Sequence, residues 1–270
     1  MLKDITLGQY FPGNTVIHRI DPRVKITVTM AYIVVLFFAK GPLSYGICLA
    51  ALLYSIFASK ISMKTVIKSM KPLLFIIVFT AVLNIFYVQA DSYIFEWGFL
   101  KVSWLGIKTA FYMALRIAML VSGTFVFLTY TTSPIMLTDG IEHLLAPLKR
   151  FKLPVHELAM MMTIALRFIP TLIEETDKIM NAQKARGADF ESGNILSRAK
   201  ALVPILVPLF ISAFRRADEL AVAMECRCYR GSEGRTRLRE LHMQSHDYIA
   251  CAITAVIFAA VIVCGMCFGI

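Results

Sequence analysis

Long apolar runs dominate the sequence, and five of them approach the ~20 residues that a helix needs to cross a hydrocarbon core about 30 Å thick. The first two runs are short and form a hairpin that turns at Lys40-Gly41-Pro42. Asp21-Pro22, just before the first run, is typical of an N-cap followed by a first-turn proline. The pattern predicts membrane-spanning helices over residues 24–39, 42–58, 72 to about 90, about 105 to 130, and 248–270.

A segment of different character, residues 131–247, separates the fourth run from the fifth. Apolar and charged residues recur there at helical spacing. Ser133-Pro134 and Pro154 are typical of helix starts, and a third helix is expected to begin near Ser197. Gly187 is well placed to end the second helix in a left-handed C-cap.

Charge gives these helices an orientation. The chain is 58% hydrophobic but has a net charge of +10, which is typical of a polytopic membrane protein with a basic cytoplasmic side and argues against a nucleic-acid binder. Basic residues number four in the N-terminal arm against one in the first loop, and four in the second loop against two in the third. We therefore expect a cytoplasmic N-terminus and an external C-terminus.

The predicted architecture is all-α, with about five transmembrane helices and a cytoplasmic set of helices. It has three parts: an N-terminal arm with four spans (1–130), a cytoplasmic helical region (131–247) and a final span (248–270).

The cytoplasmic region contains a duplicated arginine. Arg186, in AQKARGADF, and Arg227, in AMECRCYRG, lie 41 residues apart, and aligning them also aligns Asp177 with Asp218. The doublet Glu174-Glu175 then falls on the doublet Arg215-Arg216. A cation in the last turn of a helix offsets the helix dipole by about 0.3–1 kcal/mol, which would account for one such arginine. The repetition favours a docking function, because a guanidinium on a rigid helix end can enter an acidic or carbonyl-lined groove.

Two stretches of the same region, 158–168 and 201–214, are apolar nearly all round but short and broken by proline. Mutual packing is one interpretation. The other is that they lie along the membrane or cover another membrane protein, for which methionine-rich surfaces are well suited. The residues that suggest such a platform are Met160, Met161, Met162, Phe210 and Phe214.

Signatures of bond-making chemistry are missing from the sequence. It has no phosphate-binding G-x-x-x-x-G-K-[ST] and no G-x-S-x-G, and the H-E-x-x-H frame that starts at His156 fails at Met160. Cys226 and Cys228 have no complementary pair nearby, so we expect no metal site. Arg116 lies within the fourth span, where a charge suggests function unless it pairs internally, for instance with Asn84 of the third span.

A family resemblance rests on HRIDPRVK after the N-terminal arm, on ALRFIP leading to AQKARG, and on a second arginine motif before the final span. Over essentially the whole chain these features resemble the transmembrane T component of energy-coupling factor (ECF) transporters, the vitamin and metal-ion importers of prokaryotes. The resemblance implies a multi-pass scaffold in a prokaryotic cell membrane, joining two cytosolic ABC-type ATPases to a substrate-binding S component for ATP-driven uptake of a micronutrient. It also implies that this chain is not an enzyme and binds no cofactor, since the ATPases use the ATP and Mg²⁺.

Particular residues follow from the same resemblance. The family's two X-Arg-X motifs, usually Ala-Arg-Gly, end two helices that each dock into one ATPase, and the apolar parts of these helices contact the S component. Ala185-Arg186-Gly187 matches in full, whereas Cys226-Arg227-Cys228 keeps only the arginine. That departure leaves open whether the backbone bends there as it does with glycine. The alternatives are an intramembrane enzyme and a membrane signalling scaffold without ATPases.

Overall fold

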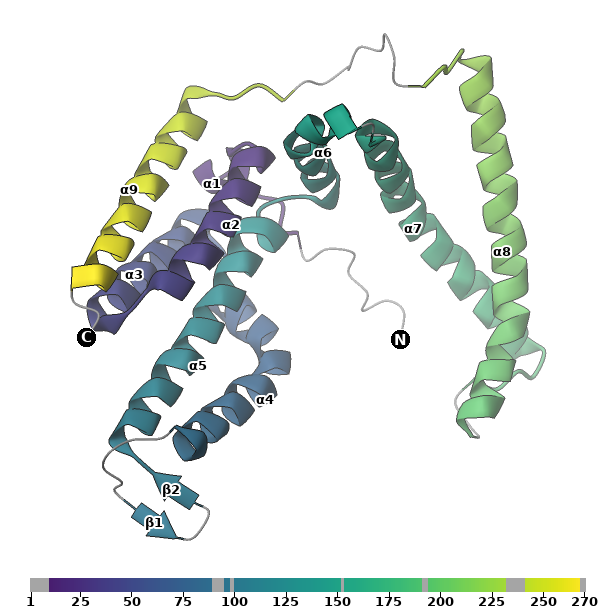
Figure 1. Ribbon diagram of the computed structural model, residues 1–270. Helices are drawn as coiled ribbons and strands as arrows, with labels where there is room; N and C mark the ends of the chain where they lie inside the picture. The colour runs from purple at the N-terminus through teal and green to yellow at the C-terminus, as the bar shows by residue number, and fades with distance from the viewer. Residues whose placement is uncertain are drawn as a thin grey trace. The chain divides into compact units, whose positions relative to one another are not determined.

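The computed structural model describes residues 10–88, 95–97, 100–151, 153–190, 194–231 and 241–267, and helices account for most of them (Figure 1). The chain forms two compact units. Gly8–Ile141 and Leu241–Ile270 make up the first, here called the bundle unit, and Glu142–Glu240 the second, called the two-helix unit.

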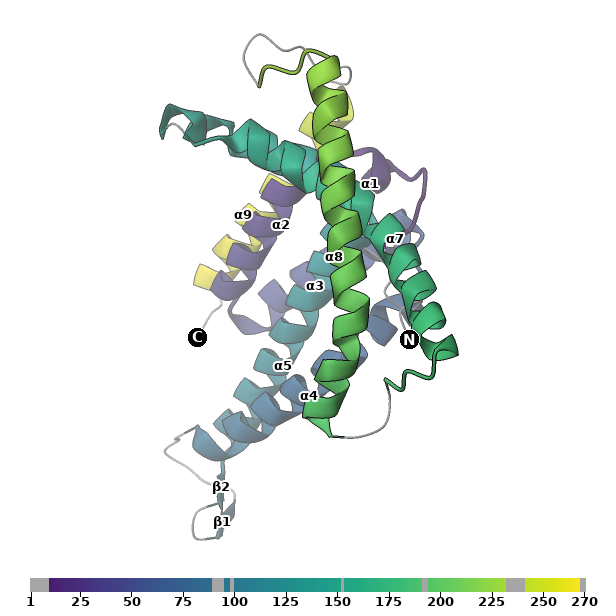
Figure 2. The same ribbon diagram turned by 90° about the vertical axis from the view of Figure 1, so that its right-hand side faces the viewer.

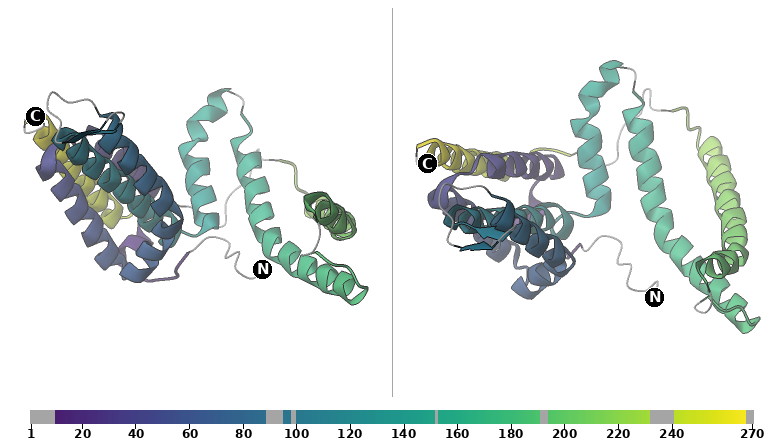
Figure 3. Two further views of the ribbon diagram at one scale, coloured as in Figure 1. Left: turned by 90° about the horizontal axis from the view of Figure 1, so that it is seen from below. Right: turned by 60° about the horizontal axis from the view of Figure 1, so that its bottom comes forward.

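The bundle unit contains most of the apolar helices, which lie side by side in Figure 3. Its elements are α1 (Val16–Arg19), α2 (Pro22–Phe38), α3 (Gly41–Ser59), α4 (Met63–Tyr87), β1 (Phe95–Trp97), β2 (Leu100–Val102), α5 (Trp104–Thr124), the π-helix η2 (Phe125–Tyr130) that continues α5, and α9 (Ser245–Cys267). The boundary between the units falls within α6 (Pro134–Leu144). The two-helix unit contains η3 (Ala146–Phe151), α7 (Val155–Ala185) and α8 (Ile195–Cys226).

Five of the described helices are long and apolar enough to cross a membrane: α3, α4, α5 with η2, α7 and α9. The number agrees with the prediction, but the set differs by one helix. The predicted first span is α2, which has only 17 residues, whereas α7, predicted to be cytoplasmic, has 31 and an apolar first half. Of the predicted spans, residues 89–90 and 268–270 lie outside the described residues.

Two details differ from the sequence-based expectation. α4 begins at Met63, nine residues before the predicted start at Pro72, so this proline lies inside a helix. Between α4 and α5 the chain forms a short antiparallel hairpin, with Phe95 paired to Val102, where only helices were expected. Strands of three residues are too short to give an alternating pattern that sequence analysis can detect. The all-α class is nevertheless confirmed.

Helix capping explains two of the helix starts. The Asp21 side chain accepts the N–H of Arg23 at 2.8 Å and begins α2, and the Ser133 hydroxyl accepts the N–H of Met136 at 3.3 Å and begins α6. Both were predicted from the Asp-Pro and Ser-Pro pairs. Capping matters because the first four N–H groups of a helix have no partner within it.

The core of the bundle unit forms where α2, α3, η2 and α9 meet. Leu36, Val126, Tyr130 and Val261 are completely buried there. α2 approaches α5 so closely that a Cβ on Gly123 would lie 2.3 Å from the ring of Tyr32. The hydroxyl of Tyr32 donates to the carbonyl of Met119 at 3.1 Å, which satisfies the polar end of a buried ring.

Candidate functional site: two arginine-bearing helix ends

The two predicted arginine motifs lie at the C-terminal ends of α7 and α8. α7 ends at Ala185 with Arg186 as its C-cap, and α8 ends at Cys226, directly before Arg227. Within the two-helix unit, α7 runs down the view of Figure 1 and α8 runs up, so the two arginine-bearing ends lie at opposite ends of the unit. All six motif residues are exposed: Ala185, Arg186, Gly187, Cys226, Arg227 and Cys228.

Both helix ends close with the same backbone hydrogen bonds. The carbonyl of Gln183 accepts the N–H of Arg186 at 3.1 Å and that of Ala188 at 3.0 Å, and Lys184 accepts from Gly187 at 3.0 Å. In α8 the carbonyl of Met224 accepts from Arg227 at 3.1 Å and from Tyr229 at 3.0 Å, and Glu225 accepts from Cys228 at 2.9 Å. This is the Schellman pattern, in which the residue after the C-cap must be left-handed.

The left-handed residues are Gly187, with φ 88°, and Cys228, with φ 57°. The backbone therefore bends after Arg227 as it does after Arg186, although the second motif lacks glycine. Glycine adopts this conformation without penalty, whereas an L-residue with a Cβ pays about 1–2 kcal/mol. Nothing lies within 4 Å of a Cβ built on Gly187, so conformation alone favours glycine there.

Each guanidinium is at the surface, where a partner molecule can reach it. Among the described residues, the structure records neither a hydrogen bond nor an ion pair for the side chains of Arg186 and Arg227. The backbone bonds that end each helix involve main-chain atoms only, so they hold each arginine at a fixed place on a rigid end. Two equal cationic ends of this kind can each enter an acidic or carbonyl-lined groove.

The predicted platform residues lie along the apolar parts of the same two helices. Met161, Met162, Phe210 and Phe214 are each more than half exposed, while Met160 is half-buried. The rings of Phe210 and Phe214, one turn apart on α8, lie 5.0 Å apart between centroids. Within the part of the chain that the structure describes, mutual packing of α7 and α8 leaves these four side chains uncovered.

The structure does not bring Arg116 and Asn84 together. The guanidinium of Arg116 donates to the carbonyl of Ala39 at 3.2 Å and lies over the rings of Phe37 and Tyr45, 5.9 and 5.7 Å from their centroids. The Asn84 amide instead donates to Thr80, in its own helix, at 2.8 Å. The carbonyl of Ala39 follows the last turn of α2, where a cation stabilises the unpaired acceptors of a helix end.

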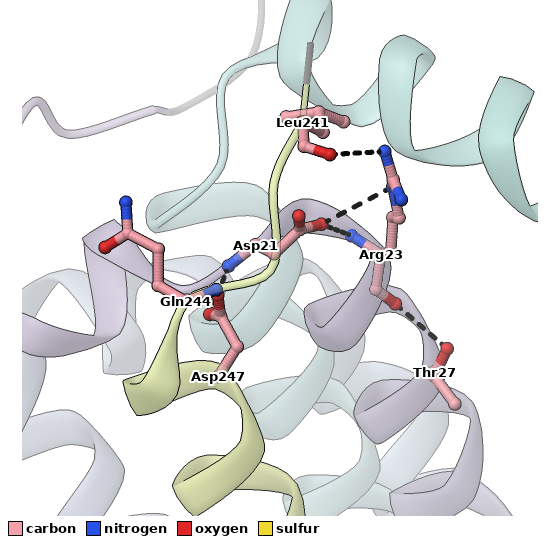
Figure 4. Close-up of polar contacts among 6 residues, drawn as sticks. All are labelled: Asp21, Arg23, Thr27, Leu241, Gln244 and Asp247. Carbon is pink, nitrogen blue, oxygen red and sulfur yellow. Dashed lines mark hydrogen bonds and ion pairs between the residues drawn. The ribbon is translucent and has the colours of Figure 1, made fainter.

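A buried polar cluster, which the sequence did not reveal, joins distant parts of the bundle unit (Figure 4). Asp247 is 2% exposed, and its carboxylate accepts the N–H groups of Asp21 and Gln244, both at 2.8 Å. Arg23 donates to the carbonyl of Leu241 at 3.0 Å. These contacts attach the start of α2 to the start of α9, more than 200 residues later in the chain.

Lys25 extends this cluster to the end of η2. The side chain is buried, and its ammonium donates to the carbonyls of Thr131 at 2.8 Å and His18 at 3.3 Å. His18, Asp21, Arg23 and Lys25 all belong to the HRIDPRVK segment, so this segment has a structural role in the bundle unit. A charged group buried in this way is stable only when its hydrogen bonds are satisfied.

The described residues contain no group of three or more His, Cys, Asp or Glu side chains placed to hold a metal ion. Cys226 and Cys228 are exposed and free. His156, which began the incomplete metal-binding frame, lies 2.9 Å from the Glu142 carboxylate through its Nδ1 atom.

The sequence is similar to proteins of one family. Residues 13–238 match the family described as cobalt transport protein, CbiQ. A protein of Ruminiclostridium cellulolyticum is 53% identical over 97% of both chains, and one of Clostridium kluyveri is 56% identical over 95% of this chain and 96% of its own. Both are called energy-coupling factor transporter transmembrane protein EcfT, as is a protein of Thermosediminibacter oceani with 54% identity over 95% of this chain and 96% of its own.

Proposed function

Because the chain belongs to the family of transmembrane T components of ECF transporters, we propose that it is their non-catalytic scaffold, joining two cytosolic ABC-type ATPases to a membrane-embedded S component. Arg186 docks into one ATPase and Arg227 into the other. The observation that carries this assignment is the pair of helix ends with the same cap, the same exposed cation and no recorded side-chain partner among the described residues. ATP and Mg²⁺ are bound by the ATPases, and the transported micronutrient by the S component.

The proposed mechanism converts ATPase closure into movement of the scaffold. When ATP brings the two ATPases together, each carries one arginine-bearing end with it. α7 and α8 are continuous over 31 and 32 residues, so each transmits a displacement from its end along its length. The exposed apolar platform, with Met161 and Phe210 on its two helices, moves under the S component, which then releases its cargo inward.

The platform is a suitable surface for another membrane protein. Four of its five side chains are more than half exposed and apolar, and unbranched methionines repack readily against different surfaces. We further propose that the N-terminus and the two-helix unit lie in the cytoplasm and that the C-terminus lies outside. Loop charge supports this orientation, because Lys60, Lys64 and Lys68 follow two predicted spans and so lie on the assigned inner side.

The arginine contacts can be tested by charge reversal. Truncating one partner of a buried, hydrogen-bonded charge pair at an interface costs about 2–5 kcal/mol, and reversal adds repulsion. The double variant Arg186→Glu/Arg227→Glu should therefore lose the ATPases and uptake, yet insert normally. Each single variant should retain more ATPase, because the remaining contact holds the second subunit at a high effective concentration.

Lys184→Glu/Arg230→Glu is the matched control. Both side chains are exposed and lie within three residues of Arg186 or Arg227, the arginine tips of α7 and α8. Their substitution therefore changes the charge by the same amount near the same helix ends. The quantity to measure is ATPase co-purified per mole of this chain in the assembled transporter. Docking predicts loss in the first double variant and near-normal stoichiometry in the second. Equal loss in both, or wild-type stoichiometry in the first, would show that these arginines only offset the helix dipoles.

A further inference from the structure

An ion pair joins the two helices that carry the arginine tips. Nη2 of Arg216, on α8, donates to Oε2 of Glu175, on α7, at 2.7 Å. The Arg216 side chain is 33% exposed and that of Glu175 23%, so water screens the pair only in part. The two residues lie 41 positions apart, which is the separation of Arg186 and Arg227.

The shared separation of 41 positions indicates a local symmetry. α7 and α8 run in opposite directions (Figure 1 and Figure 2) and carry a duplicated sequence, and a residue in one touches its own counterpart in the other. In a two-fold arrangement, a residue meets its own equivalent only near the axis. The Glu175–Arg216 contact therefore marks a pseudo-two-fold axis that relates the two helices.

The arms on either side of this axis have equal length. Arg186 lies 11 residues beyond Glu175, and Arg227 lies 11 residues beyond Arg216. At 1.5 Å per residue, each arm is about 16 Å long. If two identical or closely similar partners bind the two tips, each moves an arm of the same length about the Glu175–Arg216 contact.

At the axis the charges of the two copies differ, because an exact repeat would bring two like charges together. Exact repetition would place Glu175 against another glutamate, and like charges at this distance repel. The second copy instead has Arg215-Arg216 where the first has Glu174-Glu175, which turns a repulsive self-contact into an attractive one. At the tips, where the two copies face different partner molecules, the arginine is repeated unchanged.

We infer that Glu175 and Arg216 are positioning residues that form the pivot of the coupling movement, holding α7 and α8 in one register so that the displacement of both tips reaches the apolar platform. This inference rests on the proposed function. The pair touches neither ATPase nor cargo in this scheme. Its loss should leave the ATPases bound and hydrolysing ATP while less uptake results from each ATP.

The experiment is a charge-swap cycle in the complete transporter, reconstituted in vesicles. The variants are Glu175→Arg, Arg216→Glu and the double swap Glu175→Arg/Arg216→Glu, with Glu175→Gln as a milder change in case a reversal prevents insertion. Co-purified ATPase, ATP hydrolysis and uptake per ATP are measured for each. Single reversals should lower uptake per ATP about tenfold or more, and the double swap should restore it to within about twofold of wild type, since contacting residues show large coupling in such cycles.

Glu174→Arg and Arg215→Glu are the matched controls. Both residues adjoin the pair, and both are exposed. They should leave uptake per ATP near the wild-type value. A pivot is refuted if the double swap transports as poorly as the single reversals, or if the controls lose as much as the pair. These outcomes differ from failure of the proposed function, which would appear as absence of the ATPases from the wild-type complex.

Discussion

The left-handed residue that follows each arginine provides a quantitative test of the site's geometry. Gly187 and Cys228 occupy the same position in the same hydrogen-bond pattern, at φ 88° and 57°. A Cβ in this conformation costs about 1–2 kcal/mol, while the added freedom of glycine in the unfolded or opened chain costs about 0.5–1 kcal/mol. The Cys228→Gly substitution should therefore stabilise the closed end of α8 by about 0.5–1 kcal/mol.

The reverse change should have the opposite effect on α7. Gly187→Ala adds a Cβ that meets nothing within 4 Å, so its whole effect comes from backbone conformation. The amide of Ala188 and the amide of Tyr229 report the closing of each end, because both donate the longest-range bond of the cap at 3.0 Å. The difference of 0.5–1 kcal/mol corresponds to an about two- to fivefold change in local hydrogen exchange.

Hydrogen exchange of the purified protein, measured residue by residue, is the assay. Exchange at Tyr229 should slow in Cys228→Gly, and exchange at Ala188 should accelerate in Gly187→Ala. Cys228→Ala is the control, because it removes the thiol and keeps the Cβ, and it should leave Tyr229 unchanged. If Cys228→Ala protects Tyr229 as much as Cys228→Gly does, the sulfur rather than the backbone conformation determines the stability of this helix end.

Two further predictions concern the bundle unit. A reporter that is active only in the cytosol, fused after the last residue, should be silent if the loop charges set the orientation, and strong activity there would require an even number of crossings. Arg116→Gln should lower the free energy of unfolding by about 1–3 kcal/mol, because it removes a charged donor from the carbonyl of Ala39. Asn84→Ala should not alter the effect of Arg116→Gln when the two are combined, and thermal unfolding of the single and double variants would reveal any coupling between them.

The fold was predictable where a single physical signal dominates. Apolar length located α3, α5 and α9, and the Asp-Pro and Ser-Pro pairs located the starts of α2 and α6. The start of α4 was missed because its first turns are basic and polar, so apolar length reports only the part after Pro72. The hairpin of β1 and β2 was missed for the same kind of reason, since its strands are too short to show a period.

Contacts between residues far apart in the chain could not be predicted from the sequence. The partner of Arg116 is a main-chain carbonyl, which every residue carries, so no side-chain pattern could have singled out Ala39. Asp247 likewise binds the backbone of Asp21 and Gln244. The conformation of Cys228 was left open by propensity because glycine is preferred there, and the tertiary structure shows that the cap forms without it.

The three parts of the duplicated helices differ in how closely they repeat, and the proposed partners explain the difference. The tips repeat the arginine and the cap. Under the proposed function each tip meets its own ATPase, and two similar ATPases need equal contacts. At the axis the helices contact each other, so an exact repeat would place like charges together. Glu175 is instead paired with Arg216. In the apolar platform the counterparts of Met160, Met161 and Met162 are Ala201, Leu202 and Val203, which keep the apolar character but not the shape. In the proposed complex one S component, which has no two-fold symmetry, covers the platform, so the two faces need not be alike. Under the proposed function, two similar partners account for the repeated arginine at the tips, and contact between α7 and α8 accounts for the reversed charge at the axis. One asymmetric partner accounts for the different apolar residues of the platform.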